Sequence, residues 1–425
     1  MHMEHPEGQS VWMETAVEAP QTVPLSDSVS CDVVVIGGGF TGLSAALELA
    51  GHGASVCVLE KGQVGDGASG RNGGQVVPGL KYDPEELLVF GGETLLDFAG
   101  GAAGRTFDLI SRQKLDCHAS QDGWLQPAVT SAQMDVLKRR AEQWQRHAGV
   151  DVKILSSAEV RAQTGTSVYV GGWIDPRGGS LQPLSYVRQL AIATLAKGAR
   201  IFSHSAALAM ERQNGGWLTR TSTGSVRADK VLVCTNAYRQ PILPDLYASI
   251  FPSHSVQVAT EPLPAPIRES VLPGHLPVSD ARRLLKYMRL DPEGRFMIGG
   301  RGSFGARDTG RYFDELRACA VSMFSQLAKV KWTHQWAGKI ALTFDHLPHI
   351  HNPQPGLYAA LGYNGRGVAM GTQIGIELAR LSVGSSAEEC PLPVIPIRKI
   401  PLHLLRRPAL EAVVLWYRIL DRLGR

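Results

Sequence analysis

The sequence predicts a mixed fold in which a parallel α/β domain is interleaved with an antiparallel-sheet domain. Three observations lead to this prediction. Residues 33–60 have the pattern of a strand, a glycine turn, a helix and a second strand. A second glycine-rich stretch, "GASGRNGGQ" at 67–75, follows closely and holds too few apolar residues to pack a core. The length of 425 residues, 44% of them hydrophobic, suits two domains rather than one.

The first strand–turn–helix–strand unit has the spacing of a Rossmann-type dinucleotide site. The run 33–36 is β-branched, as in a strand buried on both faces, and Gly37, Gly39 and Gly42 follow with G-x-G-x-x-G spacing. Glu60 ends the second strand, roughly 20 residues further on, where a carboxylate accepts from a ribose 2′-hydroxyl. An acidic residue here disfavours NADP. The predicted cofactor contacts in this unit are Gly37, Gly39, Phe40, Thr41, Gly42, Glu60 and Lys61.

The second glycine-rich stretch favours FAD over NAD. After Glu60 the chain does not continue into another βα unit but enters a glycine-rich loop, 65–79. Glycines allow backbone to approach a ligand closely, so this loop is predicted to wrap a second, flat part of the cofactor. Its predicted contact residues are Ser69, Arg71, Asn72, Gly73, Gly74 and Gln75. For Arg71 and Asn72 the alternative is that they hold the loop through backbone hydrogen bonds.

Composition narrows the function classes. The net charge of +4 does not indicate a nucleic-acid partner. The six cysteines are scattered, with no C-x-x-C and no Cys/His cluster, so we expect neither a metal site nor a disulfide framework. The first residues have no secretory pattern, and no apolar run reaches the roughly 18 residues of a membrane span. A cytoplasmic location is therefore expected.

The motifs together resemble a known family. "DVVVIGGGFTGLSAALELA" and "LEKGQVGDGASGRNGGQVVPGL" resemble the FAD-dependent D-amino-acid oxidase/glycine oxidase/sarcosine oxidase superfamily. The sequence of the stretch "ASGRNGGQ" is most similar to the γ-glutamylputrescine oxidase-like and L-pipecolate oxidase-like branch. Three further segments follow in the order that the resemblance implies: "DPRGGSLQPLSYVRQLAIATLAKGARI", "ADKVLVCTNAY", and "WAGKIALTFDHLPHI" with "GLYAALGYNGRGVAMGTQIGIELARL".

The resemblance implies a D-amino-acid oxidase-like fold with a discontinuous FAD-binding domain at 30–82, 166–238 and 336–382. Residues 83–165 and 239–335 would form the substrate domain, and 383–425 a proline-rich segment with an amphipathic helix. The resemblance further assigns to FAD a set of residues from the later segments. These are Ala206, Thr235, Asn236, Gly338, Gly362, Asn364, Gly365, Gly367 and Val368.

The activity that the resemblance implies is oxidation of the C–N bond of an amine or amino acid, with hydride transfer to flavin N5 and formation of an imine. Candidates for holding the substrate are Tyr287, Arg289 and Arg301, in two predicted antiparallel strands around "DPEG", and Asn364 and Arg366 in "GYNGRG". The alternative for Arg289 and Arg301 is that they are ordinary solvated strand residues.

Two departures from sarcosine oxidases bear on the cofactor and the electron acceptor. Met297 stands where those enzymes carry a lysine that promotes reaction with oxygen, which leaves oxygen and a membrane quinone as alternative acceptors. No cysteine lies a few residues before "TFD", so the FAD is expected to be non-covalent.

The C-terminal segment 408–425 reads as a basic amphipathic helix. It is predicted either to lie on the inner face of a membrane as a peripheral contact or to pack on the protein. A membrane contact favours a cyclic secondary amino acid, such as L-pipecolate or proline, as substrate; γ-glutamylputrescine or another polyamine derivative is the alternative. Two alternatives of another class remain, a flavin domain acting on modified tRNA and a non-catalytic flavin-binding protein.

Overall fold

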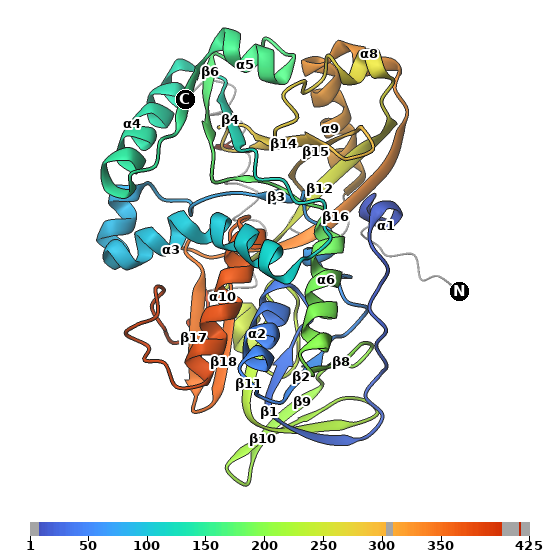
Figure 1. The fold of residues 1–425 in the computed structure, drawn as a ribbon, viewed down its shortest axis with the longest axis vertical. Helices are drawn as coiled ribbons and strands as arrows, with labels where there is room; N and C mark the ends of the chain where they lie inside the picture. The colour runs from blue at the N-terminus through green and yellow to red at the C-terminus, as the bar shows by residue number, and fades with distance from the viewer. Residues whose placement is uncertain (1–7, 303–308, 402–415, 418–425) are drawn as a thin grey trace.

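A computed structural model describes residues 8–302, 309–401 and 416–417 (Figure 1). In the described part, two large sheets form the centres of two layers that meet across the middle of the molecule. The helices are α1 (Trp12–Thr15), α2 (Phe40–Gly51), α3 (Pro84–Gln113), α4 (Ser131–Ala148), α5 (Ser157–Thr164), α6 (Pro183–Ala196), α7 (Pro244–Ala248), α8 (Ala265–Arg268), α9 (Thr309–Met323) and α10 (Gly367–Ser382), with 3₁₀ turns η1 (Ala68–Gly70) and η2 (Ser325–Lys329).

The first sheet is the predicted Rossmann-type sheet. Its order is β17-β18-β11-β1-β2-β8, and β18, β11, β1, β2 and β8 run parallel. The strands are β1 (Ser28–Ile36), β2 (Val56–Leu59), β8 (Arg200–Phe202), β9 (Ala209–Gln213), β10 (Gly216–Arg220), β11 (Ser225–Val233), β17 (His349–Gln354) and β18 (Leu357–Leu361). Helices α2, α6 and α10 lie together against the sheet, so the apolar run 33–36 is buried. The strand termini beside α2 and α10 therefore meet at one edge, where ligands bind in such sheets.

The second sheet is largely antiparallel and has the order β16-β12-β15-β14-β13-β4-β6-β5. Its strands are β4 (Trp124–Ala128), β5 (Lys153–Ser156), β6 (Gly171–Asp175), β12 (Phe251–Pro262), β13 (Val278–Ser279), β14 (Lys286–Leu290), β15 (Arg295–Arg301) and β16 (Trp332–Leu342), and a separate small pair joins β3 (Gln75–Val76) to β7 (Gly179–Ser180). The predicted pair around "DPEG" is confirmed as β14 and β15.

Alternation along these strands separates two faces of the second sheet. Leu125, Met288 and Phe296 belong to an apolar cluster with residues of α9. Their neighbours Trp124 and Tyr287 therefore point to the opposite face, because successive side chains of a strand alternate. That face is turned toward the glycine-rich loop, since Tyr287 contacts the position of a Cβ at Gly73.

Two strands shift the predicted domain boundaries. β6 and most of β16 fall in ranges assigned to the FAD-binding domain, yet both pair within the second sheet. β6 is held in the second sheet by its pairing with β4 and β5, and β16 by its pairing with β12, although Ala337 of β16 also accepts a hydrogen bond from Arg71 of the cofactor loop. The segment "SAQMDVLKRRAEQWQRHAG" forms α4 and its C-terminal glycine.

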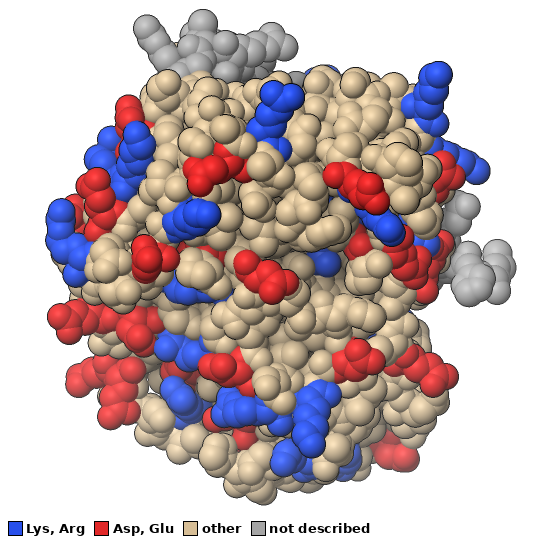
Figure 2. Space-filling view, turned by 45° about the horizontal axis from the view of Figure 1, so that its top comes forward, with Lys and Arg blue, Asp and Glu red and all other residues tan. Residues whose placement is uncertain are grey.

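The predicted C-terminal helix, 408–425, lies outside the described residues except for 416–417. Among the helices that the structure describes, none is long and apolar enough to cross a membrane. On the face drawn in Figure 2, basic and acidic side chains are interspersed rather than gathered by sign.

Candidate active site

The glycine turn after β1 forms a close-packed cradle. Gly37 has φ +111°, a conformation that favours glycine. At Gly42, a Cβ would lie 2.0 Å from the carbonyl oxygen of Gly37, so only glycine lets α2 begin this close to the strand. The N-terminus of α2 therefore points at the sheet edge, where its N–H groups and positive potential suit a pyrophosphate.

Glu60 closes the cradle at the end of β2. Its carboxylate accepts from the backbone N–H groups of Gly38 at 2.8 Å and Gly62 at 2.9 Å. Burial raises the pKa of the Glu60 carboxyl, and the two hydrogen bonds oppose that effect. Lys61 beside it is exposed, and Ala206 follows Ser205, whose N–H donates to the Glu60 carbonyl oxygen at 2.7 Å.

The loop 67–75 is tied to the helix and to itself. Ser69 Oγ accepts from the N–H of Phe40 at 3.0 Å, at the start of α2. Asn72 Nδ2 donates to the Ser69 carbonyl oxygen at 2.8 Å, and its Oδ1 accepts from the N–H of Gly74 at 2.9 Å. Arg71 Nε donates to the carbonyl oxygen of Ala337 at 2.6 Å. The Arg71 and Asn72 side chains thus hold the loop through hydrogen bonds to backbone groups. This is the alternative to direct cofactor contact that the sequence left open for them.

The second sheet holds the same loop from its other side. Arg289 is buried, and its Nη1 donates to the carbonyl oxygens of Gly74 at 3.0 Å and Leu181 at 2.8 Å. Burial lowers the pKa of the Arg289 guanidinium to about 10. Gln75 Nε2 donates to the carbonyl oxygen of Val278 at 3.1 Å. Arg289 and Gln75 therefore position the loop against the sheet.

Tyr287 is packed in a space that glycines leave open. A Cβ at Gly299 would lie 2.1 Å from the Tyr287 ring, and a Cβ at Gly73 would lie 2.7 Å from it. The hydroxyl is 2.7 Å from Ser255 Oγ, and burial raises the pKa of the Tyr287 phenol. The ring thus bridges the cofactor loop and the sheet.

The start of α10 brings a second turn to the same sheet edge. Asn236 Oδ1 accepts from the N–H of Gly362 at 3.0 Å. Asn364 is buried and has φ +50°; its Oδ1 accepts from the N–H of Thr343 at 3.0 Å and its Nδ2 donates to the Gly362 carbonyl oxygen at 2.6 Å. Asn364 therefore shapes the turn that precedes the helix, which begins at Gly367, and Gly365 beside it has φ +86°.

These residues fit FAD. The Thr235 Oγ1 at the end of β11 is buried without a hydrogen-bond partner, which is unusual for a protein interior and fits a missing polar ligand. The cradle at Gly37–Gly42 and the Glu60 carboxylate would hold the pyrophosphate and ribose. The loop 67–75, Gly338, where a Cβ would lie 3.3 Å from that of Arg71, and the turn from Gly362 to buried Val368 would surround the ring system.

Four cations share one electrostatic neighbourhood beside this turn. The pKa of the Lys81 amine falls from an ordinary value of 10.5 to about 7, first through burial and then through the charges of Arg366, Arg140 and Arg301. Lys81 as a residue is exposed. Burial also lowers the pKa of the Arg301 guanidinium. The charges of two predicted substrate residues, Arg301 and Arg366, thus act on the Lys81 amine.

Lys81 and Arg140 are not among the site residues predicted from the sequence. Lys81 directly follows the predicted cofactor loop, so its place in the chain was a usable signal. Arg140 lies on α4 and reaches the site only through the tertiary fold, where it pairs with Asp83. The other three predicted substrate residues, Tyr287, Arg289 and Asn364, have packing and backbone contacts of their own.

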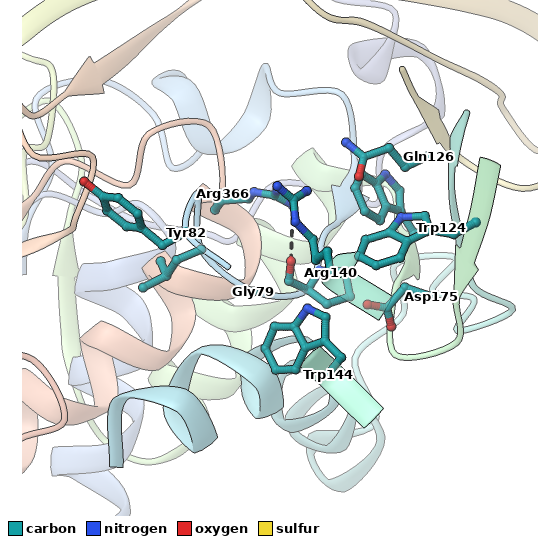
Figure 3. Close-up of a pocket in the computed structure, with 11 residues that line it drawn as sticks. Gly79, Tyr82, Trp124, Gln126, Arg140, Trp144, Asp175 and Arg366 are labelled. Carbon is teal, nitrogen blue, oxygen red and sulfur yellow. Dashed lines mark hydrogen bonds between the residues drawn. The ribbon is translucent and has the colours of Figure 1, made fainter. Parts of the chain in front are cut away.

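A pocket opens beside Arg366, between α4, the second sheet and the segment after the cofactor loop (Figure 3). Arg366 Nη1 donates to the carbonyl oxygen of Pro78 at 3.2 Å, and its guanidinium lies 5.4 Å from the centre of the Trp124 ring. The lining residues are Pro78, Gly79, Leu80, Tyr82, Trp124, Gln126, Arg140, Trp144, Trp173, Asp175 and Arg366. Among the described residues, no group of three or more His, Cys, Asp or Glu could hold a metal ion.

Known proteins resemble the chain over most of its length. The gamma-glutamylputrescine oxidoreductase of Escherichia coli (strain K12) is 32% identical over 412 residues, which cover 94% of this chain and 95% of that protein. A probable oxidoreductase, OrdL, of Haemophilus influenzae is 31% identical and covers 97% of each chain. The glycine oxidase structure from Geobacillus kaustophilus has a TM-score of 0.72 at 21% identity, over 84% of this chain and 96% of that one.

The family model described as FAD dependent oxidoreductase (DAO) matches residues 32–381. This range contains the glycine cradle, the loop 67–75, both sheets and the turn before α10. The resemblance inferred from the motifs, the fold class and the FAD cofactor are thereby confirmed. The chain belongs to the DAO family of FAD-dependent oxidoreductases, enzymes that act on amine C–N donors.

Proposed function

We propose that the protein oxidises the primary amine of γ-glutamylputrescine or of a closely similar acylated diamine. The observation that carries this proposal is the 32% identity, over 94% of the chain, to the gamma-glutamylputrescine oxidoreductase of Escherichia coli. γ-Glutamylputrescine, which the sequence left as the alternative substrate, is therefore preferred over a cyclic amino acid.

The charges at the site support an acylated amine over a free diamine. Lys81, Arg140, Arg301 and Arg366 place positive charge in one neighbourhood. A free diamine carries two positive charges at neutral pH and would be repelled there. Acylation with a glutamyl group removes one of these charges and adds a zwitterionic head group, whose carboxylate guanidinium groups bind well. The cations thus favour a substrate with lower net positive charge and a carboxylate at the end opposite the reactive amine.

The reaction removes a hydride from the carbon and a proton from the nitrogen of the amine, and water hydrolyses the resulting imine to an aldehyde and ammonia. FAD, when bound, supplies the acceptor of the hydride. The chain supplies position: Arg289 and Asn72 fix the loop 67–75, and Tyr287 packs that loop against the second sheet. A fixed loop keeps the site geometry constant, which lowers the entropic part of the barrier.

The preference for L-pipecolate or proline rested on the C-terminal helix, which lies outside the described residues. The L-proline dehydrogenase structure from P. horikoshii matches with a TM-score of 0.69 at 21% identity, and this shows the fold alone. Oxygen and a membrane quinone both remain proposed electron acceptors.

The proposal is tested by product analysis with the FAD-loaded enzyme and an artificial electron acceptor. The panel is γ-glutamylputrescine, putrescine, L-pipecolate, L-proline, sarcosine, glycine and D-alanine. We expect ammonia release from γ-glutamylputrescine with the highest kcat/KM. Turnover of L-pipecolate or L-proline with a higher kcat/KM would overturn the assignment.

A further inference from the structure

The pocket beside Arg366 contains polar groups that the protein leaves unpaired. The indole Nε1–H groups of Trp124 and Trp173 and the side-chain Oε1 of Gln126 are buried without a hydrogen-bond partner. Trp124 and Trp173 are 3% and 2% exposed. Because nearly all buried polar atoms in proteins are hydrogen-bonded, three unpaired ones lining a single pocket indicate a ligand that completes them.

Fold topology places the three groups together. β4 and β6 are neighbours, with Gln126 opposite Trp173 and Trp124 opposite Asp175. The side chains of Trp124 and Gln126 lie on one face of β4, and those of Trp173 and Asp175 on the same face of β6. Figure 3 shows Trp124, Gln126 and Asp175 around one hollow, with Trp144 of α4 closing it from below. The unpaired atoms thus converge from two strands.

The charges of the pocket are separated by sign. Arg366 and Arg140 contribute two guanidinium groups, and burial lowers the pKa of Arg366 to about 10. Asp175 contributes a carboxylate, whose two oxygens also accept from Arg177 Nε at 2.9 Å and Nη2 at 2.6 Å. Two indole donors and the guanidinium of Arg366 suit a carboxylate. The Oε1 of Gln126 and the carboxylate of Asp175 suit an ammonium group.

We propose that this pocket binds the α-amino-acid head group of the substrate, a zwitterion of one carboxylate and one ammonium. The inference rests on the proposed function, because the glutamyl part of γ-glutamylputrescine carries such a head group at the end opposite the reactive amine. The carboxylate takes the indole N–H groups and Arg366; the ammonium takes Gln126 Oε1 and Asp175. The indole rings line the space for the methylene groups that join this head group to the amide.

The first test measures binding without turnover. Quenching of tryptophan fluorescence is recorded while the FAD-loaded enzyme is titrated, under anaerobic conditions, with L-glutamine, glutaramate or 4-aminobutanamide. Glutaramate lacks the ammonium and 4-aminobutanamide lacks the carboxylate. We expect both to bind about tenfold or more weakly than L-glutamine, because each leaves charged partners unpaired. Equal binding of all three, or no saturable binding of L-glutamine, would overturn the proposal.

The second test uses Trp173→Phe, which removes one N–H but keeps a ring, and Gln126→Leu, which removes the acceptor. Each is expected to lower kcat/KM for γ-glutamylputrescine about tenfold or more, mainly through KM. For N-butyrylputrescine, which has the same amine but no head group, kcat/KM should not change. An equal fall for both compounds, or no fall for either, would contradict the proposal.

Matched controls lie elsewhere in the chain. Trp217→Phe removes another buried, unpaired indole N–H, in β10, and Gln145→Leu makes the same glutamine replacement at an exposed position of α4. Neither should change the preference between the two compounds. The FAD absorbance spectrum confirms folding of each variant.

The two levels of the proposal fail differently. If γ-glutamylputrescine is not turned over while L-glutamine binds as expected, the proposed function fails and the head-group site stands. If it is turned over and the variants leave the preference for it unchanged, the head-group site fails and the proposed function stands.

Discussion

Arg289 is the clearest case in which the structure assigns a positioning role to a residue that the sequence suggested for substrate binding. Its guanidinium donates to the carbonyl oxygens of Gly74 and Leu181. Gly74 also accepts from the N–H of Leu181, at 2.8 Å, so Arg289→Met leaves chiefly the Leu181 carbonyl unpaired. The replacement should therefore loosen the cofactor loop and leave substrate binding intact.

The magnitude follows from opposing effects. Two hydrogen bonds from a charged donor contribute about 3–6 kcal/mol together, and the cation–π contact of Arg289 with Trp12, at 5.7 Å, adds about 0.5–2 kcal/mol. Against this, the drop of the Arg289 pKa from 12.5 to about 10 means that burying its charge costs about 3 kcal/mol. The expected net loss in the free energy of unfolding is about 2 kcal/mol.

The assay compares wild type, Arg289→Met and the control Arg239→Met, an exposed arginine. Urea unfolding gives the stability, and titration of the FAD-free protein gives the Kd of FAD, which should rise about tenfold for Arg289→Met alone. Unchanged stability and FAD affinity, combined with a KM raised a hundredfold, would show that Arg289 anchors substrate and would refute the reasoning.

Three further predictions follow from the same contacts. Gly42→Ala should abolish FAD retention, because the new Cβ would lie 2.0 Å from the carbonyl oxygen of Gly37; retention of the yellow colour through gel filtration would contradict this. Trp12→Ala should lower the free energy of unfolding by about 3–5 kcal/mol, since Trp12 is fully buried and donates to the Asn72 carbonyl oxygen at 2.8 Å. A loss below about 1 kcal/mol, as expected for a single exposed contact, would argue against a packed N-terminal segment. Lys81→Met should be more stable than wild type below pH 7 and lose this advantage as the pH rises toward 10.5, because the folded protein disfavours the Lys81 proton and its pKa is about 7; a pH-independent difference in denaturation midpoints would exclude the lowered pKa.

Local patterns predicted how the segments of the proposed cofactor site fold. The G-x-G-x-x-G turn, Glu60 and the loop 67–75 are close in sequence, and each needs only its own segment to take shape. The fold class followed from them. The β14–β15 pair was also local, because its turn residues lie between two apolar runs.

The substrate side depends on contacts that sequence patterns do not contain. Alternation along a strand shows that Tyr287 and Arg289 share a face, but not that the loop 67–75 covers that face. Lys81 and Arg140 come from separate elements and meet Arg366 only in the folded chain. The unpaired atoms of Trp124 and Trp173 become visible only once β4 and β6 are paired.

The central claim is that the protein oxidises the amine of an acylated diamine through FAD. The most direct test is anaerobic stopped-flow recording of the flavin absorbance after mixing with γ-glutamylputrescine. We expect rapid bleaching with γ-glutamylputrescine, slower bleaching with putrescine, and recovery on admitting air if oxygen is the acceptor. Bleaching by dithionite but not by γ-glutamylputrescine would contradict it.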